Sequence, residues 1–475
     1  MRICFVSEGC YPYVAGGVSS WIHTMIKAFP KVDFVIWTVI VDRSMSGRFV
    51  YNLPDNVVEV HETYLNDKDW GFKARQYSIP RNARRALRTL LLGKRVDWEG
   101  IFDIVHKDDP SVNDLLMGTA FYNIIRDFYD RYYPQINFTD FLWTMRSVYL
   151  PLFQVLGQDV PKADLYHCVA TGYAGILGCL ATHINGGGLL ISEHGIYTRE
   201  REEELIKADW LQSFYKNIWI EHFKKMSQAA YDRAWAVTSL FEHARELQAE
   251  LGCPEDIQLI IPNGIDLERF KDIPRKDEDD EFVNIGAFVR VTPIKDIKTL
   301  LQAFSVAKES DPRLRLWVMG PDDEDLEYAN ECREYTKYLG ISDVIFTGRI
   351  KTLEYIGKMD FTILTSISEG QPLVILESFA AHLPVIATDV GNCRGLIFGE
   401  GKDRLGAAGI VTHLMNVNEL SSAMLELAAH PRKTAEMGEI GYRRVKARYT
   451  LAHMRRAYNA LYRTLAERNE STWPE

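Results

Sequence analysis

Cysteine is scarce in this sequence, and its seven residues lack paired or metal-ligand spacing. They are Cys4, Cys10, Cys168, Cys179, Cys253, Cys332 and Cys393. Secreted disulfide scaffolds have dense, regularly spaced cysteines, so this pattern does not fit that class. It predicts buried thiols in a reducing compartment.

The chain also lacks an excess of positive charge, because its formal net charge is -10 at pH 7. Nucleic-acid-binding domains usually carry a basic surface. We therefore expect no nucleic-acid partner.

No apolar run in the sequence suits a membrane span. The stretch 168–192 contains no Asp, Glu, Lys or Arg, but three glycines at 186–188 interrupt it, and Thr171, Thr182 and His183 suit lipid poorly. A buried helix over 171–184 followed by the strand "GLLIS" explains it better. The start "MRICFVSEG" enters a strand pattern without a signal peptide. We expect a soluble, cytoplasmic protein.

Strand-like and helix-like segments alternate in both halves of the 475 residues. In the first half, strands are expected at 2–9, 33–41, 164–170, 188–195 and 233–239. A second series begins at 282–289 and continues at 314–320, 343–348, 360–366 and 384–389. This order predicts an α/β protein with two Rossmann-like, doubly wound domains that face a central cleft.

Composition shifts set the expected domain boundaries. The first domain is expected over 1–262, with an aromatic-rich helical insert at about 62–160. Prolines and charges dominate a linker at 263–281, a second domain follows over 282–450, and a final helix over 451–475 returns to the first domain. Within the insert, 81–95 carries six basic residues and no acid, which is typical of a solvated helix face or of a surface for anionic membranes or partners.

Two acids flank an apolar run in "SEGQPLVILESFA", with Glu369 in a strand-to-helix loop and Glu377 inside the helix. Pro372 suits the first helical position. A helix start favours an anionic group such as a diphosphate, and flanking carboxylates accept hydrogen bonds from hydroxyls. The pair therefore suggests a ligand with both kinds of group.

Three further loops follow strand ends, where open sheets of this type bind ligands. Gly16 and Gly17 leave room for a ligand near a helix start. Arg290 and Lys295 share one loop and can neutralise a diphosphate without a metal. His194 follows the strand "GLLIS". Each of these residues also has an ordinary structural explanation.

Taken together, these motifs resemble the family-four retaining glycosyltransferases of the GT-B fold over nearly the whole chain. "SEGCYPYVAGGVSSWIH", "SEHGIYTRERE" and "SEGQPLVILESFA" are most similar to the cytosolic glycosyltransferases of Pel exopolysaccharide synthesis. The chain departs from many members at Asp296, Gln371 and Asn392, which bears on the donor sugar.

The resemblance implies a role for each matching residue. Arg290 and Lys295 hold the donor diphosphate, Glu369 binds sugar hydroxyls, Glu377 binds the ribose, and His194 lies near the reacting carbon. The implied catalytic set is His194, Arg290, Lys295 and Glu369. The implied donor-binding set is Gly16, Gly17, Arg290, Lys295, Gly348, Arg349, Glu369, Gly370, Gln371, Pro372, Leu373 and Glu377.

The resemblance further implies a metal-independent hexosyltransferase without a cofactor, acting on a nucleotide sugar, with UDP-glucose favoured, and on a polysaccharide acceptor. Partner proteins of exopolysaccharide synthesis at the inner membrane are expected to recruit it. The acidic triplets "DKD" (67–69) and "DED" (323–325) are interpreted as solvated loops.

Other classes remain open. An inactive nucleotide-binding scaffold would keep the fold without turnover, and a UDP-sugar epimerase would share the fold but needs an acid/base set that these residues do not supply. A nicotinamide-dependent oxidoreductase would need a glycine fingerprint, which is missing.

Overall fold

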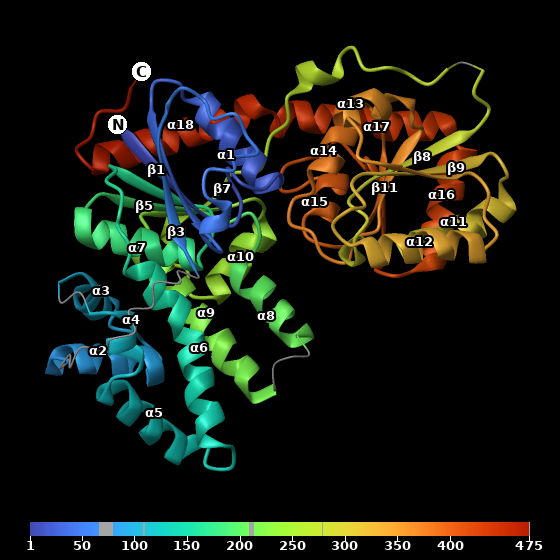
Figure 1. Cartoon of the computed structure of the whole chain (residues 1–475). Helices are drawn as coiled ribbons and strands as arrows, with labels where there is room; N and C mark the ends of the chain where they lie inside the picture. Colours follow the sequence, from blue (N-terminus) through green and yellow to red (C-terminus); the bar gives the residue numbers. More distant parts are fainter. Residues whose placement is uncertain (66–78, 108–109, 209–212, 278, 475) are drawn as a thin grey trace. The chain divides into compact units, whose positions relative to one another are not determined.

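The computed structural model describes residues 1–65, 79–107, 110–208, 213–277 and 279–474 (Figure 1). These residues form two compact units, one of Met1–Ile260 with Tyr458–Glu475 and one of Ile261–Ala457. Each unit contains a wholly parallel sheet with helices between its strands, so the predicted pair of Rossmann-like domains is confirmed.

The sheet of the first unit has seven strands in the order β3-β2-β1-β4-β5-β6-β7. Their bounds are β1 Arg2–Glu8, β2 Asp33–Ile40, β3 Val57–Tyr64, β4 Leu165–Cys168, β5 Gly188–Ser192, β6 Ala236–Ser239 and β7 Gln258–Ile260. The strand β1 lies in the interior of the sheet, because it pairs with both β2 and β4. Buried apolar side chains run along β1, β2 and β5, as expected for parallel strands covered on both faces.

Helices cover this sheet and also form the insert between β3 and β4. The helices are α1 Gly17–Ala28, α2 Arg81–Leu92, α3 Trp98–Lys107, α4 Val112–Leu116, α5 Thr119–Tyr132, α6 Phe138–Leu156, α7 Tyr173–Asn185, α8 Tyr197–Lys207, α9 Ser213–Arg233 and α10 Glu242–Glu250. Short 3-10 helices occur at Arg43–Met45 and Glu255–Ile257. The uncharged stretch 168–192 forms β4's end, the buried helix α7 and β5, as predicted.

The second unit contains six strands in the order β10-β9-β8-β11-β12-β13. They are β8 Val283–Phe288, β9 Leu314–Met319, β10 Val344–Gly348, β11 Phe361–Leu364, β12 Val385–Thr388 and β13 Gly409–Thr412. The helices are α11 Ile297–Ser310, α12 Leu326–Tyr338, α13 Thr352–Tyr355, α14 Leu373–Ala380, α15 Cys393–Phe398, α16 Val417–Ala429 and α17 Pro431–Arg448, with 3-10 turns at Leu267–Phe270, Pro293–Lys295 and Ile356–Lys358. The last helix, α18 Leu451–Arg468, begins in this unit.

The proline- and charge-rich segment 263–281 packs largely into the second unit. Phe270 and Ile273 are buried in its core, and Ile265 bridges to Thr450. Most of its described charged side chains are exposed, and these apolar residues anchor the segment.

The last helix, α18, belongs to both units in sequence, because the chain re-enters the first unit at Tyr458. The buried Tyr458 hydroxyl lies 3.0 Å from Ser192 Oγ, and Tyr462 lies 2.8 Å from His167 Nδ1. The C-terminal turns thus complete the polar core at the ends of β4, β5 and β6.

Across the described ranges, every helix is too short or too polar to cross a lipid bilayer.

Candidate active site

The loop after β8 positions both predicted cations. Arg290 lies in the loop, and Lys295 ends the following 3-10 turn. Asp296 then takes a left-handed conformation (φ 48°) and its carboxylate accepts a hydrogen bond from the Thr299 N–H at the start of α11. This cap fixes where the loop ends and the helix begins.

Lys295 and Glu369 form an ion pair, with Lys295 Nζ 2.5 Å from Glu369 Oε1. The side chains are only 15% and 13% exposed, so solvent screens this pair little. The structure therefore brings one of the predicted cations directly to one of the predicted acids.

Arg290 pairs instead with Glu324, at 2.6 Å. Both side chains are about half exposed, and such surface pairs contribute roughly 0–1 kcal/mol. Arg290 is thus able to exchange this partner for another anion at little cost.

The backbone around Glu369 is fixed by a close approach of Gly391. A Cβ at Gly391 (φ 51°) would lie 2.2 Å from the Glu369 carbonyl oxygen and 2.4 Å from that of Gly370. The Asn392 N–H also donates to the Gly370 carbonyl, at 2.9 Å. Only glycine fits here, and the loops after β11 and β12 are locked together by it.

The helix α14 begins at Leu373, one residue later than predicted, and Pro372 is its N-cap. The ψ of Pro372, 115°, is extended rather than helical. Gln371 is buried beside it, and its Oε1 accepts a hydrogen bond from the Asn263 N–H at 2.7 Å.

Glu377 lies on α14 without a hydrogen-bond partner among the described residues. Burial raises the pKa of its carboxyl to about 7, and Arg269 partly opposes this shift. An acid without a protein partner in a half-buried position is free to accept hydrogen bonds from a ligand.

Several other buried polar atoms of these loops also have no partner in the described parts of the chain. They are Asn263 Oδ1, Thr292 Oγ1, Asp296 Oδ2, Ser366 Oγ, Gln371 Nε2 and Asn392 Nδ2. Buried polar groups are nearly always hydrogen-bonded, so this group of exceptions makes the edge of the sheet a candidate binding site.

Gly348 is the last residue of β10, the edge strand of the same sheet, and Arg349 follows it. Gly348 has a positive φ of 68°, and Arg349 is exposed, with Nη2 3.7 Å from Asp323. Neither residue contacts the Lys295–Glu369 pair through a hydrogen bond or an ion pair.

In the first unit, His194 follows β5 as predicted and packs edge-on against Trp21, with ring centroids 4.6 Å apart. Burial lowers the pKa of His194 to about 4, so its imidazole is neutral at pH 7. Its Nε2 has no partner among the described residues.

The sequence interpretation missed Glu193, the residue immediately before His194. Its buried carboxylate accepts hydrogen bonds from Thr171 (3.1 Å), Tyr231 (2.6 Å) and Gln248 (2.9 Å). These donors come from three distant segments, so no spacing rule in the sequence could have indicated the network. It anchors the backbone that carries His194.

Gly16 and Gly17 are surrounded by open space, since a Cβ at either position would meet no described atom within 4 Å. Gly17 is the first residue of α1, and the backbone of Gly16 is extended. The fold itself therefore does not require glycine at either position.

We expect Gly17→Ala to leave the free energy of unfolding within about 1 kcal/mol of wild type, since alanine is the better helix former. If phosphate groups approach this backbone, the added methyl should lower turnover at least about tenfold, which corresponds to ~1.4 kcal/mol. Urea unfolding and initial rates test the two parts separately, and unchanged turnover would contradict the predicted approach.

The acidic triplet 323–325 is engaged in local contacts. Asp323 and Glu324 pair with Arg349 and Arg290, and Asp325 caps α12 through the Tyr328 N–H at 2.9 Å. The triplet 67–69 lies outside the described residues. No group of three metal-ligating side chains occurs in the described part of the chain.

Comparison with known proteins gives two family matches. Residues 1–256 match the family described as "Domain of unknown function (DUF3492)", and residues 279–430 match the family described as "Glycosyl transferases group 1". The second unit therefore carries a glycosyltransferase domain. Because the first match spans more than half of the chain, the chain belongs to the DUF3492 family.

Curated relatives are similar over part of their length. The D-inositol 3-phosphate glycosyltransferase of Geodermatophilus obscurus is 29% identical over 217 residues, which cover 41% of this chain and 48% of that protein. The chain thus spans about half the length of the curated relatives that it matches.

Two solved structures share the fold across the whole chain. Anabaena Alr3699/HepE in complex with UDP has a TM-score of 0.62 at 14% identity and covers 98% of this chain and 100% of its own. The sucrose-phosphate synthase of Thermosynechococcus elongatus has a TM-score of 0.61 at 16% identity, covering 98% and 99%. The fold is therefore GT-B.

Proposed function

We propose that this protein is a retaining, metal-independent glycosyltransferase that moves a hexose from a nucleotide sugar to a growing exopolysaccharide. A UDP-sugar is the proposed donor, with UDP-glucose favoured, and HepE, bound to UDP, supports this choice. The observation that carries the proposal is the largely buried Lys295–Glu369 ion pair beside the start of α14, together with Glu377 on that helix, which has no hydrogen-bond partner among the described residues.

The chain's own residues suit each part of such a donor. Lys295 and Arg290 supply cations for the diphosphate, and preorganised cations stabilise the charge that develops on a leaving phosphate. Glu369 accepts hydrogen bonds from sugar hydroxyls, and Glu377 accepts them from the ribose. The proposed donor-binding set also includes Gly16, Gly17, Gly348 and Arg349 and the loop 370–373.

In the proposed reaction, the bond between the sugar carbon and the diphosphate oxygen breaks, and a bond to the acceptor oxygen forms on the same face. The departing diphosphate takes the proton of the acceptor hydroxyl. His194 lies near the reacting carbon in this proposal, and its neutral ring offers a hydrogen bond rather than a charge, because its pKa is lowered to about 4.

Arg290→Ala tests the contribution of the exposed cation. We expect turnover to fall at least about tenfold, since losing one charge-assisted contact costs roughly 1.5–3 kcal/mol. The free energy of unfolding should change by less than about 1 kcal/mol, because its partner Glu324 remains solvated. Wild-type turnover in this variant would remove Arg290 from the proposed mechanism.

We further propose that the protein is similar to PelF, the glycosyltransferase of Pel exopolysaccharide synthesis. It acts in the cytoplasm, where synthesis proteins of the inner membrane recruit it. The helical insert is the proposed surface for these partners or for the acceptor, and Tyr122, Tyr132 and Trp143 on it are 40%, 58% and 49% exposed. Deletion of 81–95 would not test this surface cleanly, because it also removes core residues of α2. Substituting the exposed Tyr122, Tyr132 and Trp143 avoids this problem. Pull-down of the synthesis proteins by the substituted chain should then be weaker than by wild type, and unchanged pull-down would contradict the proposal.

The first experiment is a panel of UDP-, GDP- and ADP-sugars with a metal chelator present, in which released nucleotide and sugar products are measured. Chelator-resistant release of one nucleotide would support a metal-independent transferase and identify its donor. A new nucleotide sugar would indicate an epimerase. Binding of nucleotide by calorimetry, without turnover even when a polysaccharide acceptor is supplied, would favour an inactive scaffold.

A further inference from the structure

The helix α2 presents two different faces. Ala83, Ala86, Leu87, Leu90 and Leu91 on one face are buried in the core of the first unit. This apolar face is therefore already covered by protein and is not free to enter a lipid bilayer. The exposed arginines on the other face are what remains available for binding.

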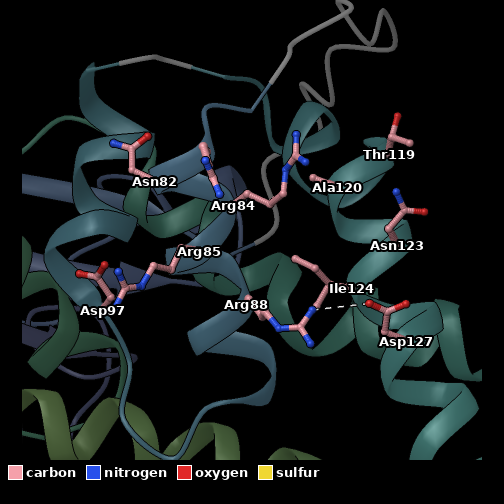
Figure 2. A pocket seen from close by; sticks show the side chains of 11 residues that line it. Asn82, Arg84, Arg85, Arg88, Asp97, Thr119, Ala120, Asn123, Ile124 and Asp127 are labelled. Carbon is pink, nitrogen blue, oxygen red and sulfur yellow. Dashed lines mark ion pairs between the residues drawn. The ribbon is translucent and has the colours of Figure 1, made fainter.

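These arginines line a cavity between α2 and α5, with a volume of about 990 Å³ (Figure 2). Arg81, Arg84, Arg85 and Arg88 come from α2. The volume is at the upper end of the range typical of small-molecule sites. The arginines thus line a concave space rather than a flat or convex surface.

The positive charge of the cavity is only partly neutralised. Arg88 faces Asp127 of α5, at 3.5 Å (Figure 2). The other carboxylate, Asp97, accepts a hydrogen bond from the Gly100 N–H at the start of α3, at 3.0 Å. Within the described ranges, no carboxylate lies at ion-pair distance from the other three arginines.

We propose that this cavity is a binding site for a ligand that carries phosphate groups. The planar guanidinium matches phosphate oxygens in a bidentate manner. A carboxylate brings one charge, whereas a phosphate brings nearly two, which suits three neighbouring cations better. The site lies in the helical insert and uses none of the residues assigned to the glycosyl donor.

The remaining walls suit an organic phosphate rather than the inorganic ion. Asn82, Thr119 and Asn123 offer neutral hydrogen-bonding groups, and Ala120 and Ile124 offer apolar contact. Small-molecule sites commonly combine a few polar groups with apolar walls in this way. The phosphate could be carried by a free molecule or by a lipid headgroup, and the experiment separates these two sources.

The test is calorimetric titration of the full chain with inorganic tripolyphosphate at fixed salt. We expect Arg84→Gln/Arg85→Gln to weaken binding at least about tenfold. The control is Arg95→Gln/Arg126→Gln, which removes the same charge from exposed arginines that do not line the cavity. The control should bind within about twofold of wild type. Equal weakening in both variants, or no binding by wild type, would overturn the proposal.

Two further variants control for misfolding and for tripolyphosphate binding at the proposed donor site. Asp127→Asn frees Arg88 and should tighten tripolyphosphate binding, a gain that damage to the fold cannot produce. Lys295→Ala removes a cation of the proposed donor site, so it should remove at most the part of the tripolyphosphate binding that belongs to that site and leave the cavity's part in place. Complete loss of binding in this variant would assign the signal to the donor loops and overturn the proposal.

The source of the phosphate is tested with vesicles of anionic phospholipid and of neutral phospholipid. Binding to anionic vesicles that tripolyphosphate competes away and that Arg84→Gln/Arg85→Gln abolishes would support the cavity and identify a headgroup. Tripolyphosphate binding without vesicle binding would support it and identify a free phosphorylated molecule. The proposal would be overturned if the wild type did not bind tripolyphosphate and if vesicle binding were unchanged both by tripolyphosphate and by Arg84→Gln/Arg85→Gln.

Discussion

Replacing Lys295 with alanine is expected to lower turnover at least about a hundredfold, the usual effect of removing one preorganised donor from a developing anion. It should also destabilise the fold by about 1–3 kcal/mol, because Glu369 is then left buried with an uncompensated charge. Initial rates and urea unfolding measure the two effects. Arg290→Ala is the matched control, since its exposed pair should show only the kinetic effect.

The double variant Lys295→Ala/Glu369→Gln separates catalysis from stability. The amide at 369 carries no charge, so most of the lost stability should return. Turnover should stay low, because neither the cation nor the carboxylate is restored. Recovery of turnover in the double variant would show that Lys295 acts only by supporting Glu369.

Glu377→Ala is expected to weaken nucleotide binding at least about tenfold at pH 8 while the protein stays folded. Glu377 has no partner among the described side chains, so the fold loses no internal hydrogen bond. Calorimetric titration with UDP measures the affinity. An unchanged affinity in a folded variant would refute the ribose role.

The same carboxyl should give a characteristic pH dependence of stability. Its pKa is raised from 4.5 to about 7 by burial, so its contribution to stability is full below pH 4.5 and is lost as pH rises through 7. Glu377→Gln lacks this titration. It should therefore be more stable than wild type at pH 8, on the order of 3 kcal/mol, and nearly equal to it at pH 4.

The results expected for Glu377→Ala and Glu377→Gln differ from the common assumption that a functionally important residue also stabilises the fold. A more stable Gln variant at pH 8 together with a weakly binding Ala variant would locate Glu377 in a ligand site. A Gln variant that is less stable at pH 8 would show that the carboxylate has a structural partner and contradict the assignment.

The sequence was sufficient to predict most of the strands that carry the site. The runs at 2–9, 188–195, 282–289 and 360–366 are short, apolar and bounded by turns, and each forms a strand of a parallel sheet. The strand β3 was not predicted, because "VVEVHETY" contains charged residues typical of an edge strand. The short strands β7 and β13 were also missed, and β7 has only three residues.

Contacts between distant segments were the part that the sequence could not provide. The motif "SEGQPLVILESFA" predicted a role for Glu369 and Glu377, but not that Lys295 forms an ion pair with Glu369 while Glu377 has no hydrogen-bond partner among the described residues. The network around Glu193 likewise joins segments up to 55 residues apart. Such pairings depend on how the loops fold back, which local patterns do not encode.

The return of the chain to the first unit at Tyr458 limits how the protein can be divided. The family match ends at residue 256, yet His167, Ser192 and Thr238 find buried partners in Tyr458 and Tyr462. A fragment cut at residue 260 would lose these tyrosines and expose a polar core together with the aromatic rings around it. The first unit is therefore discontinuous in sequence, and an independently folding version would require the last helix to be joined back to residues 1–260.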